Sequence, residues 1–135
     1  MSAAFAVGKQ LPAQTYRVTR ADLIRYAGAS GDFNTIHWSD RKAREVGLPG
    51  VIAHGMYTMA LAGRALDVWT GEPGAVVEFG VRFTKPVPVP DNDEGTEVTV
   101  SGSVRTVADG MAQIDLTVTS GGEKVLAQAK AVVRT

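Results

Sequence analysis

A change of hydrophobic pattern in the second half of the chain constrains the fold more than any other feature. From Met56 to Trp69, apolar side chains are spread around much of a helix circumference, which is typical of a largely buried helix. After Gly71 the pattern changes to apolar residues alternating with polar ones, which indicates β-strands. We therefore expect an α+β protein in which an antiparallel sheet curls around one long helix.

Four segments after that helix are predicted to be strands. The Asp109-Gly110 and Gly121-Gly122 pairs are turn signals that separate the last three of them, whereas prolines follow the first. A sheet that wraps one helix leaves a face and an edge uncovered, so we expect a dimer. With no low-complexity linker, residues 1–135 are predicted to form one domain. The predicted strands, about four in one meander, are residues 75–83, 98–104, 114–118 and 125–133.

The first half of the chain carries helix signals. After a leader of residues 1–13, residues 14–18 are expected to form a short edge strand. Thr19 and Asp22 have the spacing of a capping box, which predicts a helix over residues 21–30. Residues 39–46 are predicted to form a second, shorter helix with Ser39 or Asp40 as its cap.

Composition excludes several classes of function. Lys+Arg and Asp+Glu both number 14, so the formal net charge is zero and nucleic acid is not expected as a partner. The chain has no cysteine, which excludes disulfides and thiolate chemistry and fits a cytoplasmic protein. We expect neither a signal peptide in residues 1–8 nor a membrane span, because no apolar run is long enough.

The loop between the two predicted helices contains the best candidates for catalysis. Asp32 and His37 lie close together there, and a carboxylate and an imidazole that converge can divide acid and base work near neutral pH. A structural interpretation competes with this one, because Asp often caps a helix and Asn34 can bond its own backbone.

A second candidate lies where the long helix is expected to begin. The first N–H groups of a helix have no partner within it, and glycine at position 55 allows close approach to the backbone. The Gly55 N–H is therefore a candidate donor to the oxygen of a polarised carbonyl. Gly55 can instead serve only to start the helix tightly, and for the His54 side chain we favour a packing or capping role.

These parts together suit the addition of water to a conjugated double bond, or its removal. Asp32 and His37 would hold the water or hydroxyl, and the Gly55 N–H would polarise the neighbouring carbonyl. No metal ion and no organic cofactor are expected for this chemistry.

The same residues resemble a known family. Tyr26-Ala27-Gly28-Ala29-Ser30-Gly31-Asp32-Phe33-Asn34-Thr35-Ile36-His37 is similar to the hydratase motif of the MaoC-like hot-dog dehydratases. Ile52-Ala53-His54-Gly55-Met56 is similar to that family's second landmark. The chain most resembles the catalytic B subunits of mycobacterial-type (3R)-hydroxyacyl-ACP dehydratases, from about residue 8 to its end.

The resemblance implies a hot-dog fold with residues 56–69 as the central helix. It also implies Asp32 and His37 as the catalytic pair, Asn34 as the residue that shapes the loop, and the Gly55 N–H as the oxyanion donor. The substrates would be (3R)-hydroxyacyl or trans-2-enoyl thioesters of acyl carrier protein or coenzyme A, in type II fatty acid or mycolic-type lipid synthesis. Thr35 departs from the family, which usually has proline there to stiffen the turn.

Several alternatives stay open at this point. The same residues would serve a stand-alone (R)-specific enoyl-CoA hydratase of fatty acid oxidation or polyester synthesis. A hot-dog thioesterase and a non-catalytic partner subunit are further alternatives. The sequence does not distinguish a homodimer from a heterodimer with a related hot-dog subunit, nor does it reveal the acyl chain length, the direction of the reaction, or which residue handles which proton.

Overall fold

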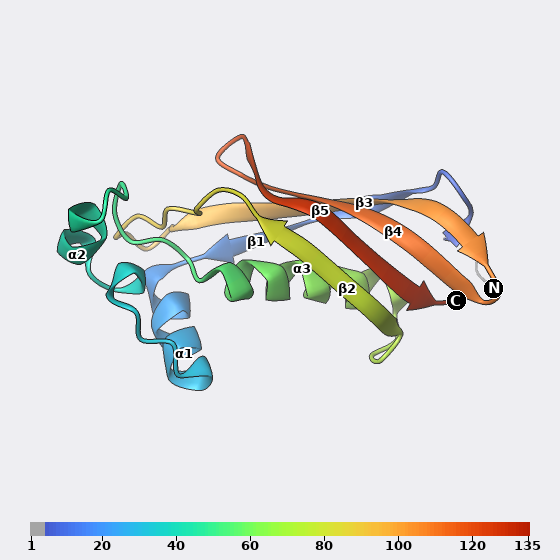
Figure 1. The fold of residues 1–135 in the computed structure, drawn as a ribbon, viewed down its shortest axis with the longest axis horizontal. Helices are drawn as coiled ribbons and strands as arrows, with labels where there is room; N and C mark the ends of the chain where they lie inside the picture. The colour runs from blue at the N-terminus through green and yellow to red at the C-terminus, as the bar shows by residue number, and fades with distance from the viewer. Residues whose placement is uncertain (1–4) are drawn as a thin grey trace.

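A five-stranded antiparallel sheet curls around one long helix in the computed structural model, which describes residues 5–135 (Figure 1). Residues 1–4 lie outside the described residues; they begin the expected leader and the stretch in which no signal peptide is expected. The helices are α1 (Arg20–Ser30), η2 (Thr35–His37, a 3-10 turn), α2 (Asp40–Glu45) and α3 (Gly55–Thr70). The strands are β1 (Gln10–Val18), β2 (Val76–Phe83), β3 (Thr96–Ala108), β4 (Met111–Ser120) and β5 (Glu123–Arg134).

The predicted helices are confirmed, because their signals are local. Thr19 caps α1 through a complete capping box, in which its side chain accepts from the Asp22 N–H and the Asp22 carboxylate accepts from the Thr19 N–H. Ser39 caps α2. The central helix α3 extends one residue beyond the predicted range at each end, and Gly71 ends it in a left-handed conformation.

The predicted meander is correct only in part. Strands β3, β4 and β5 follow one another as expected, but β2 pairs with β5 rather than with β3, and β1 pairs with β3. The order across the sheet is β1-β3-β4-β5-β2. Prolines follow β2 and disfavour a tight hairpin with the next strand. The chain instead passes from β2, at one edge of the sheet, to β3, which lies next to the opposite edge strand β1.

The edge strand β1 is longer than predicted. It begins at Gln10 and includes the Leu11-Pro12 pair, which the sequence interpretation assigned to the leader. The pairing with β3 shifts register between Leu11 and Gln14, and this irregularity accommodates a proline that has no N–H to donate.

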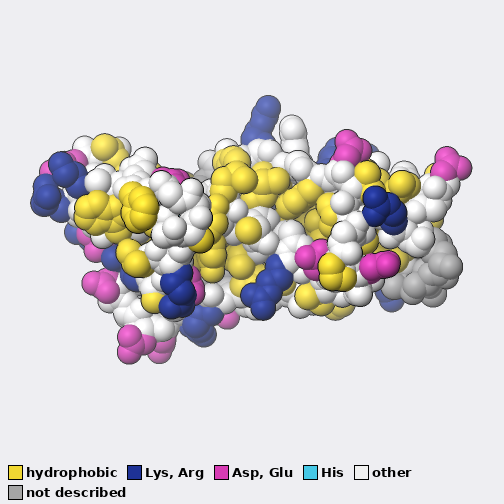
Figure 2. All heavy atoms as spheres, turned by 90° about the horizontal axis from the view of Figure 1, so that it is seen from below, with side chains coloured by type: hydrophobic (Ala, Val, Ile, Leu, Met, Phe, Trp, Pro, Cys, Tyr) yellow, Lys and Arg dark blue, Asp and Glu magenta, His cyan; other side chains and the backbone are white. Residues whose placement is uncertain are grey.

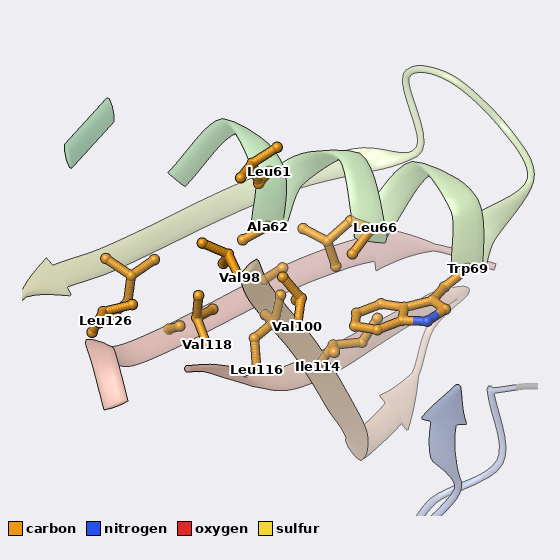
Figure 3. Close-up of a cluster of buried hydrophobic side chains, with 14 of the residues drawn as sticks. Leu61, Ala62, Leu66, Trp69, Val98, Val100, Ile114, Leu116, Val118 and Leu126 are labelled. Atoms are coloured by element: carbon orange, nitrogen blue, oxygen red, sulfur yellow. The ribbon is translucent and has the colours of Figure 1, made fainter. Parts of the chain in front are cut away.

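One face of α3 forms the core with the concave side of the sheet. Ala62, Leu66 and Trp69 point toward strand residues that include Ile114 (Figure 3), and Leu61 is buried in the same cluster. The opposite face of α3 is open: Met56 is 56% exposed and Val68 is half exposed. The expectation that α3 is buried nearly all round is therefore wrong for a single chain, because the sheet covers only one of its sides.

Within residues 5–135, none of the helices combines the length and apolar character that crossing a membrane requires.

Helices α1 and α2 gather at one end of the sheet, far from the C-terminal end of β5 (Figure 1). The N-terminus of α3 points toward that end, and so the loop between α1 and α2 lies beside it.

Gly102 of β3 lies close against Trp69 of α3. A Cβ atom at this position would lie 2.9 Å from the Trp69 ring. We expect Gly102→Ala to lower the free energy of unfolding by about 1–3 kcal/mol, because the well-packed ring has to move. Gly80→Ala in β2, where a Cβ meets nothing within 4 Å, is the matched control, and urea unfolding measures both. Equal stability of the two variants would contradict this packing.

Candidate active site

The loop after α1 is folded by its own short side chains. Gly31 ends α1 in a left-handed conformation, and Asp32 Oδ1 then accepts from the Asn34 N–H at 3.2 Å. Asn34 Oδ1 in turn accepts from the Ile36 N–H at 3.2 Å and caps the η2 turn. Thr35 occupies the first position of this turn. The two side-chain hydrogen bonds close the loop without the proline that the family usually has there.

His37 is held in one tautomer by the main chain. Its Nδ1 lies 2.8 Å from the Ile52 carbonyl oxygen, and because a carbonyl can only accept, Nδ1 carries the proton. In the neutral ring, Nε2 is then the unprotonated nitrogen. It lies 3.9 Å from Asp32 Oδ2, too far for a direct hydrogen bond. Two hydrogen bonds of about 2.8 Å can meet across this separation, so one water or hydroxyl oxygen can contact both groups.

The segment that His37 binds is fixed on both sides. The Ile52 N–H donates to the Ile36 carbonyl at 3.1 Å, which ties residues 51–53 to the η2 turn. On the other side, the Ala53 N–H donates to the Val87 carbonyl at 2.9 Å and the Val89 N–H donates back to Val51 at 3.0 Å. These hydrogen bonds hold residues 51–53 between the loop after α1 and the proline-containing segment after β2, so the three segments keep fixed positions relative to one another.

Asp40 anchors the same segment from α2. Its Oδ1 accepts from the Val51 N–H at 2.9 Å and from the Arg20 guanidinium at 2.8 Å. These contacts, the Val51 hydrogen bond foremost, hold the pKa of Asp40 below its ordinary value. The carboxylate therefore stays ionised and continues to link α1, α2 and residue 51 at neutral pH.

His54 lies directly against the candidate pair. It is 1% exposed, and its ring stacks on the His37 ring with centroids 3.8 Å apart and planes at 22°. Its Nε2 lies 3.1 Å from the Asp32 carbonyl oxygen, so Nε2 carries the proton. In the described part of the chain, its Nδ1 is buried without a hydrogen-bond partner. Tyr26 of α1 packs edge-on against the same ring at 4.7 Å.

Gly55 is the first residue of α3 and follows His54 directly. It lines a largely apolar pocket of about 340 Å³ together with Thr58, Phe83 and Leu126. A Cβ atom at Gly55 would lie 2.9 Å from the Phe83 ring, so only glycine fits under this ring as it stands. The helix dipole favours negative charge at this end of α3, so a carbonyl oxygen that gains charge would be stabilised here.

The structure brings three of the residues discussed above together. Ligand-type atoms of Asp32, His37 and His54 all lie within 4.8 Å of one another, and Gly55 is adjacent in the chain. Asn34 lies in the same loop, but its side chain bonds the backbone rather than facing the other groups. A larger hollow of about 820 Å³ between β2 and β5 includes none of these residues.

The cluster does not suit a metal ion. The two imidazole rings are stacked, so their in-plane lone pairs run side by side instead of converging on one point. One nitrogen of each ring is also occupied by a backbone carbonyl. The arrangement is suited to proton transfer at Asp32 and His37 beside a donor at the helix end.

Sequence reasoning underestimated two residues. It assigned His54 a packing role, and the ring is indeed buried, but it also contacts both candidate catalytic residues. It gave Phe83 no role at the site, yet this ring lies against Gly55. Both contacts join residues far apart in the chain; for His54, the only available signal was the family landmark in which it stands before Gly55.

The pKa of His54 predicts how stability depends on pH. Burial lowers this pKa below its ordinary value of 6.5, and the neighbouring His37 adds to the effect while the Asp32 carbonyl opposes it. Below about pH 6.5 the unfolded chain therefore binds more protons than the folded one at this site, so the free energy of unfolding falls as the pH decreases.

Urea unfolding at about pH 7.5 and 5.5 measures this loss of stability. His54→Gln has no titrating ring at this position and should lose less stability than the wild type between the two pH values. An equal loss in both proteins would assign the pH dependence to other groups.

Comparison with known proteins identifies the family of the chain. Residues 3–123 match the family described as "MaoC like domain". The chain is 36% identical over 115 residues to 3-hydroxyacyl-thioester dehydratase X of Mycobacterium tuberculosis, an alignment that covers 79% of this chain and 39% of that protein.

Solved structures agree with this match. A MaoC-like dehydratase superposes with a TM-score of 0.92 at 37% identity, over 96% of this chain and 40% of that one. The R-hydratase PhaJ1 from Pseudomonas aeruginosa superposes with a TM-score of 0.81 at 25% identity, over 96% of this chain and 81% of its own. The fold is therefore the hot-dog fold, as expected, and the chain spans about two fifths of the length of the first two relatives.

Proposed function

Since this chain belongs to the MaoC-like domain family, we propose that it catalyses the reversible addition of water to trans-2-enoyl thioesters, which forms (3R)-hydroxyacyl thioesters. The observation that carries this proposal is the 3.9 Å separation of His37 Nε2 and Asp32 Oδ2. This separation suits one shared water or hydroxyl oxygen beside the N-terminus of α3. The names of the relatives, a hydroxyacyl-thioester dehydratase and an R-hydratase, support the same reaction.

The proposed dehydration moves two protons and one hydroxyl. His37 Nε2, unprotonated in the neutral ring, takes the proton from Cα of the (3R)-hydroxyacyl thioester. Asp32, which enters the step as the protonated acid, helps to donate this proton to the hydroxyl that leaves C3 as water. The proton that His37 has accepted returns to Asp32 before the next turnover. The Gly55 N–H stabilises the negative charge that develops on the thioester oxygen. In the reverse direction, Asp32 and His37 together orient and activate the water that adds to C3.

The pocket beside Gly55 supports an acyl substrate. Its lining is mostly apolar, and Lys85 stands among the lining residues. An acyl chain can lie along Leu126 and Phe83 while its thioester carbonyl faces the start of α3. Both acyl carrier protein and coenzyme A present such a thioester through the same arm. We therefore assign the thioester class and leave the carrier to a comparison of the two substrates.

We further propose that the working enzyme is a dimer with a second hot-dog subunit. Hydrophobic side chains gather across the middle of the face on which α3 lies (Figure 2). The two dehydratases compared above are each more than twice as long as this chain, which supports pairing with a second hot-dog unit. Light scattering on the purified chain distinguishes a homodimer from a chain that pairs with a related subunit. Large apolar residues exposed in the single chain include Ile24, Phe33, Met56, Val68, Val77 and Phe83.

Removing either member of the pair should abolish most of the activity. We expect Asp32→Asn and His37→Gln each to reduce kcat for trans-2-enoyl-CoA hydration by about 10²- to 10⁴-fold, since each removes one proton-transfer group. The loss of enoyl-thioester absorbance measures the rate, and urea unfolding shows that the variants fold.

Asp109→Asn is the matched control for the first variant. It makes the same chemical change in the turn between β3 and β4, where asparagine tolerates the positive φ of 54°. It should retain wild-type activity. If a folded Asp32→Asn or His37→Gln variant stays near wild-type rates, that residue has been assigned the wrong role.

A further inference from the structure

We propose that His54 is a positioning residue that fixes all three parts of the proposed site: the Asp32 backbone, the His37 ring and the start of α3. This inference rests on the proposed function, because it explains how the groups assigned there are held in place. It assigns His54 more than the packing role that the sequence suggested.

The first contact fixes the loop. His54 Nε2 donates to the Asp32 carbonyl oxygen at 3.1 Å, across 22 residues of sequence. The carboxylate of Asp32 is half exposed, and among residues 5–135 its hydrogen bond is a local one, from the Asn34 N–H. The hydrogen bond from His54 is therefore a long-range link that fixes the position of the Asp32 backbone. The position of the backbone in turn determines where Oδ2 lies relative to His37.

The second contact fixes the plane of the His37 ring. The hydrogen bond from Nδ1 to the Ile52 carbonyl defines one point of that ring but leaves it free to tilt about the bond. Stacking on His54 at 3.8 Å and 22° restricts this tilt. The lone pair of Nε2 then has a fixed direction, which proton transfer requires. Tyr26, edge-on to His54 at 4.7 Å, keeps the supporting ring itself in place.

The third connection runs through the backbone of His54, which leads directly into α3. His54 is the N-cap of α3, and its carbonyl accepts from the Tyr57 and Thr58 N–H groups at 3.0 and 3.2 Å. The next N–H in the chain is that of Gly55, the proposed oxyanion donor. Because one residue bears the cap and both ring contacts, a shift of His54 would move the donor and the acid/base pair together.

A packing role alone does not account for an imidazole at this position. Within the described residues, Nδ1 is buried without a partner, which is unfavourable and which a phenyl ring would avoid. The N–H donor at Nε2 accounts for an imidazole here, because it bonds the Asp32 carbonyl and a phenyl ring has no such donor. Burial also keeps the ring uncharged, and a neutral ring does not repel the positive charge that His37 gains when it accepts a proton.

Two variants separate the two ring contacts. His54→Phe retains a stacking ring and loses the donor to Asp32, whereas the Gln side chain in His54→Gln places an amide N–H near Nε2 and loses the stack. We expect each to lower kcat by about 10- to 100-fold with KM changed far less, because the substrate still binds while the reacting groups are misplaced. Urea midpoints for both variants show whether they remain folded under the assay conditions.

A spectroscopic measurement tests the inference without activity. The chain has two histidines, so each variant leaves His37 as its single imidazole. In ¹⁵N NMR spectra, the two His37 ring nitrogens should have well-separated shifts in the wild type and in His54→Phe, as one tautomer requires. In His54→Gln, without the stack, these shifts should move toward each other as the ring loosens.

The outcomes are distinct. A folded His54→Phe variant with wild-type kcat, together with an unchanged His37 spectrum in His54→Gln, would overturn the inference. A loss of activity that appears only as a raised KM would also overturn it. If the wild-type protein hydrates no enoyl thioester, either alone or with a related hot-dog subunit added, the proposed function fails. The His37 spectra alone then decide whether His54 positions this ring.

Discussion

The hydrogen bond from His37 Nδ1 to the Ile52 carbonyl is the constraint on which the candidate site depends. It joins the loop after α1 to the segment that leads into α3. That segment is itself bonded to Ile36 on one side and to Val87 and Val89 on the other. With one imidazole nitrogen committed to the carbonyl, the other is left free to face Asp32.

The remainder of the fold supports this junction. The sheet buries one face of α3 and so fixes the axis of this helix, which begins at the site (Figure 1). Packing so tight that Gly102 has no room for a Cβ atom makes the helix position well defined. A rigid helix end and a loop tied to it set the separation between His37 and Asp32 that the proposed proton transfer needs.

Much of this architecture was predictable because its signals are local. The Thr19 capping box, the apolar run before Gly71 and the Asp109-Gly110 turn each depend on residues near one another in the chain. The pairing of β2 with β5 was not predictable in this way, since periodicity reveals a strand but not its neighbour. The length of β1 was underestimated because Pro12 resembles a break, whereas a register shift accommodates it.

The same distinction applies to the site. Asp32, Asn34 and His37 stand in one short motif, so the sequence singled them out, and Gly55 followed from its place at a predicted helix start. The contacts of His54 became visible only in three dimensions, because they reach back 22 residues to Asp32 and 17 (54 − 37) residues to His37.

The most direct test of the account is to identify the product that the purified chain forms from a trans-2-enoyl-CoA. Chiral chromatography determines which 3-hydroxyacyl enantiomer appears, and a thiol reagent detects free coenzyme A in the same reaction. The account predicts the (3R)-hydroxyacyl thioester with its thioester bond intact. The (3S) product, or the release of free thiol without hydration, would contradict it.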